Sequence, residues 1–136
     1  MTFKMTRATA LRGALLATFL PLAAAAGAQS LTPMRGEVTS FTEVFAVRVF
    51  PSNPYGHRIR LEVKVYDQDF KPVNAQVSPS SFMLGSQASR PVTVVVPFTD
   101  AATRKVRVGA ESIPFPNQQT QIRAQICGKF LARRLT

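Results

Sequence analysis

Residues 57–67, with the sequence HRIRLEVKVYD, carry the clearest pattern in the chain. Apolar and polar side chains alternate along this stretch, which is typical of a β-strand with one face on a core and the other in water. Its apolar face comprises Ile59, Leu61, Val63 and Val65. The alternation predicts a strand of an antiparallel sheet, because strands buried on both faces form continuous apolar runs instead.

Shorter runs rich in β-branched and aromatic residues lie on both sides of this strand, separated by Pro, Gly, Asn and Asp. No run shows a convincing helical period, so the sequence predicts an all-β protein. Residues 51–54 and 112–117 are predicted to be loops, because their prolines cannot donate to a strand ladder. The other predicted strands are residues 31–36, 43–50, 73–77, 79–84, 91–98, 104–110 and 119–134.

About seven short strands at spacings near ten residues predict an immunoglobulin-like antiparallel β-sandwich with Greek-key connections. A small closed barrel is the alternative architecture. The strand count and the proline-rich loops favour the sandwich.

The first 28 residues have the features of a secretory signal peptide. Three basic residues precede an apolar run over residues 14–26, and an Ala-Gly-Ala triplet ending at Ala28 supplies a cleavage site. A membrane-anchoring helix is the alternative, but the run is shorter than the about 20 apolar residues that span a bilayer, and Pro21 interrupts it. We therefore expect cleavage after Ala28 and a periplasmic or secreted protein that does not span a membrane.

Removal of this leader would leave residues 29–136, enough for a single domain with a modest core. The leader holds three of the 17 Lys and Arg residues and none of the seven acids, so the formal charge would fall from +10 to +7. Exported proteins rarely meet nucleic acid, so the expected anionic partners are lipid, an acidic protein surface or a chain-terminal carboxylate. An ordinary solvated basic surface is the alternative.

The residues that catalysis or metal binding would need are scarce in this sequence. His57 is the only histidine, and Cys127 is the only cysteine, so no disulfide can form within the chain. Asp67 and Asp69 lie in a predicted turn, where Asp usually bonds to the backbone. No clustered metal ligands, nucleophile motif or glycine-rich phosphate loop is present. The sequence predicts neither an enzyme nor a cofactor or metal site.

Two surfaces remain as candidate binding sites, and the first is a basic sheet face. If the strands at 57–67, 104–110 and 119–134 are neighbours, their outward side chains share one face, on which only Glu62 opposes the positive charge. The candidate anion-binding residues of this face are Arg58, Arg60, Lys64, Lys105, Arg107, Arg123 and Lys129. The ordinary polar side of an antiparallel sheet is the alternative interpretation.

The second candidate surface is the last strand, in which Ile122, Ala124, Ile126, Gly128 and Phe130 alternate with polar residues and Cys127. One interpretation is an inward face that packs on the core. The other is a terminal strand at a sheet edge, which can pair with an incoming extended segment.

Several motifs in a fixed order connect these features to a known family. The order is Asn53-Pro54-Tyr55, a strand ending in VKVYD, then VSPSSFML, a Val-rich strand, AESIPFP and TQIRAQICGKFLARR. This order resembles the amino-terminal immunoglobulin-like domain of PapD-like pilus chaperones, over most of residues 40–134. The resemblance implies a PapD-like β-sandwich in a periplasmic, non-enzymatic protein.

In that family the domain caps pilus subunits by lending its last strand, and two basic residues hold the subunit's terminal carboxylate. Lys129 matches the last-strand lysine, and Arg35 is the nearest candidate for its first-strand partner. Ile122 and Ala124 match the groove-filling positions, and Ile126 continues the strand. The resemblance implies an exported protein partner, such as a pilus-like subunit. The alternative is an envelope-associated domain whose basic face binds anionic surfaces.

Overall fold

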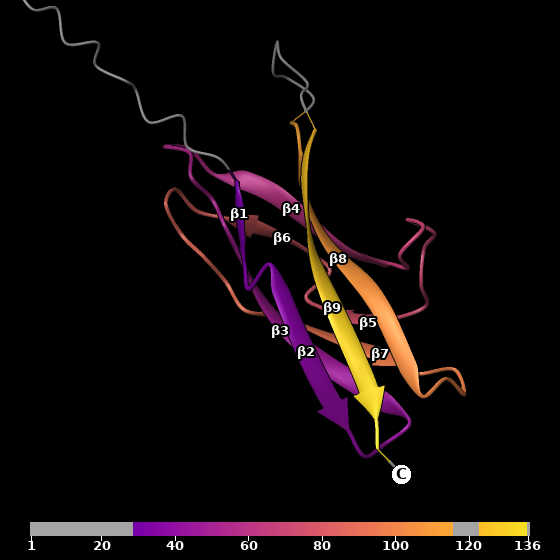
Figure 1. The fold of residues 1–136 in the computed structure, drawn as a ribbon. Helices are drawn as coiled ribbons and strands as arrows, with labels where there is room; N and C mark the ends of the chain where they lie inside the picture. The colour runs from indigo at the N-terminus through magenta and orange to yellow at the C-terminus, as the bar shows by residue number, and fades with distance from the viewer. Residues whose placement is uncertain (1–28, 116–122, 136) are drawn as a thin grey trace, which may run out of the picture.

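The computed structural model describes residues 29–115 and 123–135, which form nine strands in two sheets that pack face to face (Figure 1). No helix in this described part is long and apolar enough to cross a membrane. The strands are β1 (Ser30–Thr32), β2 (Arg35–Ser40), β3 (Val44–Ser52), β4 (Ile59–Tyr66), β5 (Gln76–Ser78), β6 (Ser81–Leu84), β7 (Val92–Pro97), β8 (Thr103–Ile113) and β9 (Ala124–Arg134).

The two sheets have separate sets of strands. The four-stranded sheet has the order β1-β3-β7-β5, and the five-stranded sheet has the order β2-β9-β8-β4-β6. All the strand pairs in these two orders are antiparallel except β2 and β9, which run in parallel. This arrangement confirms the predicted sandwich over the barrel. It also confirms that the three strands expected to carry the basic face, now β4, β8 and β9, are neighbours.

The core lies between the sheets and is built from the alternate residues that the sequence pattern predicts. Removal of their apolar surface from water is the main favourable contribution to the stability of such a sandwich. The rings of Phe45 and Phe98 meet in this core with centroids 4.9 Å apart. Its buried members include Phe45, Val47, Val49, Ile59, Leu61, Val63, Val65, Val92, Val94, Val96, Val106, Val108, Ala110 and Phe130.

The single edge strand predicted at residues 31–36 is wrong. The chain instead forms β1 and β2, which belong to opposite sheets. In β1, Leu31 is buried and pairs with Pro51 of β3; in β2, Arg35 pairs with Lys129 of β9. Pro33 lies between the two strands and has no N–H to donate, which interrupts one ladder and lets the chain cross to the other sheet.

Both proline-containing loops begin later than predicted. Pro51 and Ser52 belong to β3, because β1 pairs with this end of the strand. Ser112 and Ile113 extend β8, where Ser112 is in register with residues of β4 and β9. In both places a partner strand distant in sequence continues the ladder, and local sequence carries no information about such a partner.

The turn after β3 is held together by Asn53, which is fully buried. Its Nδ2 group donates to the carbonyl oxygens of His57, Leu84 and Gly85 at 2.8, 3.1 and 3.0 Å. Its Oδ1 atom accepts the backbone N–H of Tyr55 at 2.9 Å. One amide side chain therefore fixes the entry to β4 against the end of β6.

Three expectations concern, wholly or in part, residues that the structure does not describe. The signal peptide at residues 1–28 lies outside the described residues and stays a prediction, as does the single domain over residues 29–136. Ile122, expected to present part of the last strand, also lies outside the described residues.

Candidate functional site

Strand β9 has a paired half and an open half on its outer side. Its second half, from Lys129 to Arg134, pairs in parallel with the whole of β2. No described strand pairs with its first half, from Ala124 to Gly128, on that side; β1 lies close to β9 there but pairs with β3 of the other sheet (Figure 1). We expected the last strand to lie at the edge of its sheet. This expectation is wrong for residues 129–134, which pair with β2, and agrees with the described chain for residues 124–128.

The backbone of the open half carries hydrogen-bonding groups that face this side. The N–H of Lys129 donates to the carbonyl of Met34 at 2.8 Å, so the backbone of Lys129 points toward β2. Backbone direction alternates along a strand, and the register between β8 and β9 is continuous. The N–H and C=O groups of Gln125 and Cys127 therefore point to the open side, where an added strand would find them.

The inward side chains of β9 belong largely to the protein's own core. Phe130 is buried, and Ile126 is half-buried and packs against the core. Ala124 is half-buried at the end of the sandwich, where it lines a cavity of about 180 Å³ together with Tyr55 and Phe115. Of the candidate pairing residues in the described chain, only Ala124 therefore lies beside an unfilled apolar space.

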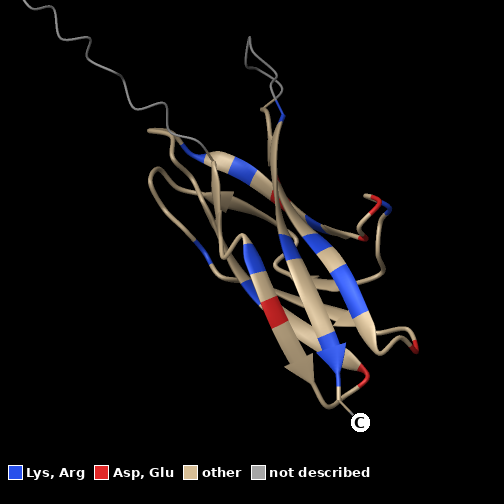
Figure 2. Ribbon diagram, viewed as in Figure 1, with Lys and Arg blue, Asp and Glu red and all other residues tan. Residues whose placement is uncertain are grey.

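On the outer face of the sheet, three cations form a row across adjacent strands. Arg35 of β2 is in register with Lys129 of β9, and Lys129 is in register with Arg107 of β8. Figure 2 shows the three blue segments side by side on these strands. Residues in register on neighbouring strands point to the same face, so the three cationic groups share one region of solvent. We call Arg35, Lys129 and Arg107 the basic row.

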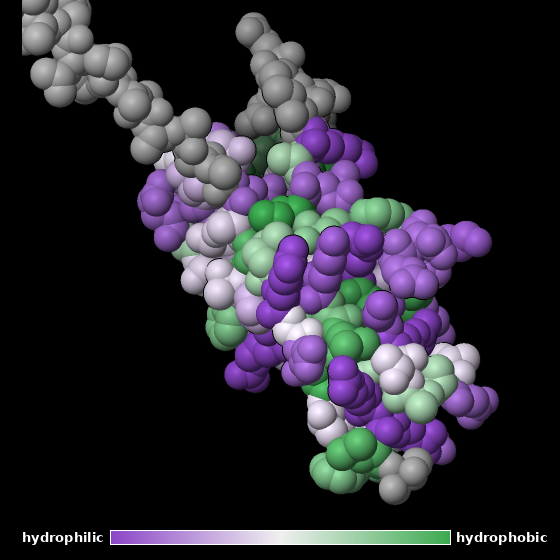
Figure 3. Space-filling model, viewed as in Figure 1, coloured by the Kyte–Doolittle hydropathy of each residue, from purple (hydrophilic) through white to green (hydrophobic). Residues whose placement is uncertain are grey.

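The basic row borders an open groove of about 570 Å³, and hydrophilic side chains gather over this part of the surface (Figure 3). The groove is lined by the basic row together with Gly36, Glu37, Gln68, Lys105, Val106, Phe130 and Leu131. Neither the basic row nor Lys105 has a carboxylate within 4.0 Å among the described residues. The groove is therefore a candidate site for an anion, because no carboxylate of the described chain pairs with these cations.

Arg107 is held in place by an aromatic ring from the loop after β4. Its guanidinium carbon lies 4.3 Å from the centroid of the Phe70 ring, at cation–π distance. The loop is shaped by Asp67, whose Oδ1 atom accepts the N–H groups of Asp69 and Lys71 at 2.8 and 2.9 Å. The aspartates at 67 and 69 mark the turn in the sequence, but the direction of the Phe70 ring depends on contacts with β8, and sequence analysis missed this residue.

The wider basic face is less uniform than predicted. Arg60, Lys64 and Lys105 lie on the outer face of the sheet, whereas Arg58 and Arg123 lie just before β4 and β9. The expectation that only Glu62 opposes these cations is wrong, because Glu37 and Glu111 also face outward. Four of the predicted cations that have no carboxylate partner among the described residues line the groove: Arg35, Lys105, Arg107 and Lys129.

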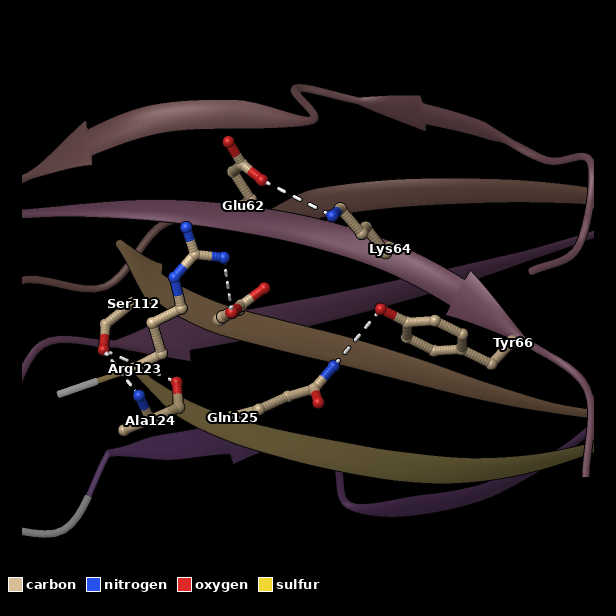
Figure 4. Close-up of polar contacts among 8 residues, drawn as sticks. Glu62, Lys64, Tyr66, Ser112, Arg123, Ala124 and Gln125 are labelled. Carbon is tan, nitrogen blue, oxygen red and sulfur yellow. Dashed lines mark hydrogen bonds and ion pairs between the residues drawn. The ribbon is translucent and has the colours of Figure 1, made fainter. Parts of the chain in front are cut away.

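Two acidic residues of this face that lie away from the groove form ion pairs with neighbouring cations (Figure 4). Arg123 pairs with Glu111 at 3.5 Å, and Lys64 pairs with Glu62 at 3.7 Å. Figure 4 also shows Gln125 reaching across β8, where its Nε2 group donates to the hydroxyl of Tyr66 at 3.3 Å. Neither ion pair involves Lys105 or Arg107, the two cations of β8 that line the groove.

Cys127 lies on the outer face of β9, half-buried and unpaired within the described chain. Burial raises the pKa of its thiol above the usual value, and the positive charge of Arg107 opposes this effect. The thiol is therefore protonated at neutral pH.

Elsewhere the titratable residues are occupied structurally. The His57 ring stacks on that of Tyr55 with centroids 5.4 Å apart. Asp67 is engaged by its own loop. Within residues 29–115 and 123–135, no three side chains of His, Cys, Asp and Glu come together in a way that could hold a metal ion. The groove, with its cations that have no carboxylate partner, remains the candidate binding site for an anion.

No family model and no curated protein matches this sequence. Solved structures do match the fold. A chain of the Salmonella enterica complex of SafA pilin with the SafB chaperone is 19% identical, with a TM-score of 0.67 over 79% of this chain and 54% of that one. The Escherichia coli chaperone DraB is also 19% identical, with a TM-score of 0.66 over 79% of this chain and 55% of that one.

A third match is to a chain of the CsuC–CsuE chaperone–tip adhesion subunit pre-assembly complex of Acinetobacter baumannii. It is 13% identical, with a TM-score of 0.55 over 79% of this chain and 52% of that one. This chain thus spans about half the length of the solved chains in these three matches. The matches confirm the expected fold, an immunoglobulin-like sandwich of the PapD-like chaperone type.

Proposed function

We propose that this chain is an exported, non-enzymatic domain that binds another exported protein by adding one of its strands to the open half of β9. The observation that carries the proposal is the position at which β2 begins. Arg35, its first residue, is in register with Lys129, so within the described chain no strand pairs with this edge of β9 before Lys129, and β2 pairs with it from there on. The open edge therefore ends at the two cations.

The basic row also indicates the direction of the incoming strand. A strand parallel to β9 would run toward β2 and end where β2 begins, which places its terminal carboxylate beside Arg35 and Lys129. An antiparallel strand would bring an amino group to the same cations. Charge-assisted bonds from Arg and Lys favour the carboxylate, so we infer the parallel orientation and a partner segment at a chain terminus.

The comparisons support the class of partner. Two of the matched structures are complexes of a chaperone with a pilin or with a tip adhesion subunit, and another match is a periplasmic chaperone. By analogy with these proteins, we propose a pilus-like subunit as the partner and the periplasm as the compartment. We do not propose the envelope-associated alternative, because the acids Glu37, Glu62 and Glu111 interrupt the basic face and no comparison supports it.

The proposal can be tested with Gln125, whose N–H faces the open edge. Gln125→Pro removes this donor and leaves the donors that face β8 in place, because the groups that pair with β8 belong to the alternate residues. Gln125→Ala is the matched control, since it keeps the N–H and removes the bond to Tyr66. Binding of short peptides of alternating Thr and Val, with a free or an amidated carboxyl end, is measured by fluorescence anisotropy.

We expect the free-carboxylate peptide to bind wild type and the Gln125→Ala variant, and to bind Gln125→Pro about tenfold more weakly. Amidation should weaken binding to wild type by a similar factor. Equal binding of free and amidated peptides, or equal binding to the Pro and Ala variants, would show that strand addition ending at the cations is wrong.

A further inference from the structure

We propose that Arg107 gives the groove a second anionic subsite, and that the groove therefore selects partner segments whose terminal residue is Asp or Glu. This inference rests on the proposed function and specifies the chemistry of the partner. One carboxylate, at the end of the main chain, would be held by Arg35 and Lys129. The other, on the side chain of the last residue, would be held by Arg107.

Arg107 lines the groove without a polar partner among the described residues. Arg123 pairs with Glu111, and Arg104 donates to the carbonyl oxygen of Pro97 and to Thr99. The Nε atom of Arg107, like that of Arg134, is buried without a hydrogen-bond partner, and of these two arginines only Arg107 lines the groove. A guanidinium has five N–H donors, so the described chain leaves most of its hydrogen-bonding capacity for a ligand.

The Phe70 ring holds Arg107 without neutralising it. The ring lies against the guanidinium at 4.3 Å, and Phe70 is itself more than half exposed. Phe70 has a φ angle of 59°, a left-handed conformation that few bulky residues adopt. In this conformation the Phe70 ring covers the guanidinium of Arg107. The contact holds the arginine side chain in place before a ligand binds.

The charge of the basic row also exceeds what one carboxylate can balance. Three cations lie on adjacent strands, at a spacing of about 4.8 Å between strands, and like charges in register repel each other. Glu37 is the one acid that lines the groove, and it makes no ion pair with the basic row at 4.0 Å or less. A ligand with two carboxylates would remove more of this repulsion than a ligand with one.

The register places the side chain of the partner's last residue on the correct face. Met34 lies beside Gly128, since its carbonyl accepts the N–H of Lys129. A parallel strand that stops before Met34 would have its last residue beside Cys127, whose side chain points to the outer face. Across β9 from that position lies Gly109, the register partner of Cys127 on β8. The side chain of the terminal residue would therefore lie on the same face as Arg107.

Gly109 has no side chain on the outer face of β8, between these two positions. A Cβ atom at this position would lie 2.9 Å from Nε2 of Gln125 and 3.1 Å from the ring of Tyr66, so the glycine lets both side chains lie flat over β8. The thiol of Cys127 lies over the same point, 3.2 Å from the position of that Cβ atom. An Asp or Glu side chain of the added strand would therefore reach Arg107 over these three side chains.

The inference is tested with two short peptides of alternating Thr and Val that differ only in the last residue, Glu or Gln, both with a free carboxyl end. The protein is the chain as it exists after export. We expect wild type to bind the Glu peptide about tenfold more tightly than the Gln peptide, as one charge-assisted bond allows. Arg107→Gln should abolish this preference, so that the variant binds the two peptides with affinities within about twofold of each other.

Two further variants provide controls. Phe70→Ala should reduce the preference while the fold is retained, because the ring is largely exposed. Lys64→Gln removes one positive charge from the same face without lining the groove, and it should keep the full preference.

Three outcomes separate the possibilities. Equal affinity for the Glu and Gln peptides, with amidation of the carboxyl end still weakening binding, would overturn this inference alone. A preference that survives in Arg107→Gln, or that falls equally in Lys64→Gln, would also overturn it. Absence of binding by either peptide would overturn this inference together with the proposed function.

Discussion

Arg35 and Lys129 are register partners on two parallel strands, although they lie near opposite ends of the described chain. Both are exposed, and neither has a carboxylate within 4.0 Å among the described residues. Two like charges in register destabilise a sheet, by an amount similar to what an opposite pair contributes. The protein keeps them together at a cost in stability, as expected of a binding site rather than of a structural contact.

The first prediction concerns that cost. Lys129→Gln should raise the free energy of unfolding by about 0.5 kcal/mol at low salt, because it removes repulsion from Arg35 and Arg107. The gain should disappear at high salt, where charges are screened. Urea unfolding at two salt concentrations measures both effects. The control Lys64→Gln loses its ion pair with Glu62 and should give no gain; a loss of stability in Lys129→Gln would contradict the prediction.

The second prediction concerns the buried amide of Asn53. Asn53→Ala leaves three carbonyl oxygens and one N–H without their partner, so we expect a loss of about 3 kcal/mol in the free energy of unfolding. Chemical denaturation measures the loss. Ser86→Ala is the matched control, because it removes one exposed hydrogen bond to Tyr55 in the same region and should cost less than about 1 kcal/mol. Similar losses in the two variants would show that the Asn53 contacts are not specific.

The third prediction concerns the contact between β2 and β9. A Cβ atom at Gly128 would lie 2.9 Å from the ring of Phe130 and 3.3 Å from the carbonyl oxygen of Met34. Gly128→Ala should therefore destabilise the protein by about 1 to 3 kcal/mol and speed hydrogen exchange at the N–H of Lys129. Gly85→Ala, at a position with open space, should change stability by less than about 0.5 kcal/mol. Unchanged exchange at Lys129 in Gly128→Ala would contradict the prediction.

The fourth prediction concerns the thiol of Cys127. Burial raises its pKa, so the reactive thiolate forms only above the pH at which an exposed cysteine ionises. Alkylation by iodoacetamide should therefore have its midpoint at a higher pH than alkylation of a cysteine peptide. Because the charge of Arg107 lowers the pKa, Arg107→Gln should move the midpoint higher still. A midpoint at or below that of the peptide, or a downward shift in the variant, would contradict the prediction.

Local pattern was enough to predict much of the fold. The alternation in residues 57–67 identifies the buried face of β4, and the same rule places Val106, Val108 and Ala110 in the core. Lys105, Arg107 and Lys129 could be assigned to the outer face for the same reason, since a side-chain period of two fixes the face once one side is buried. Pro33 lies inside a run that looks continuous in composition, which is why β1 and β2 were predicted as a single strand.

The candidate site was less accessible from sequence, because it depends on which strands are neighbours. Arg35 was a candidate only through the resemblance to pilus chaperones, and its contact with β9 follows from a parallel pairing that no local pattern encodes. Phe70 was missed because the turn marked by Asp67 does not reveal which way the ring points. Glu37 and Glu111 were missed as acids of the outer face, although they share it with the predicted cations.

The sequence by itself determined that the chain forms short strands with one buried face, and that Lys and Arg gather on the other. Only the tertiary structure decided that β2 begins beside Lys129, that the edge of β9 is open up to Gly128, and that Arg35, Lys129 and Arg107 form one row. The physical reason is that side-chain alternation is a local property that selects a face. Strand order and register depend on pairing between segments distant in the chain, which is set by the packing of the whole sandwich.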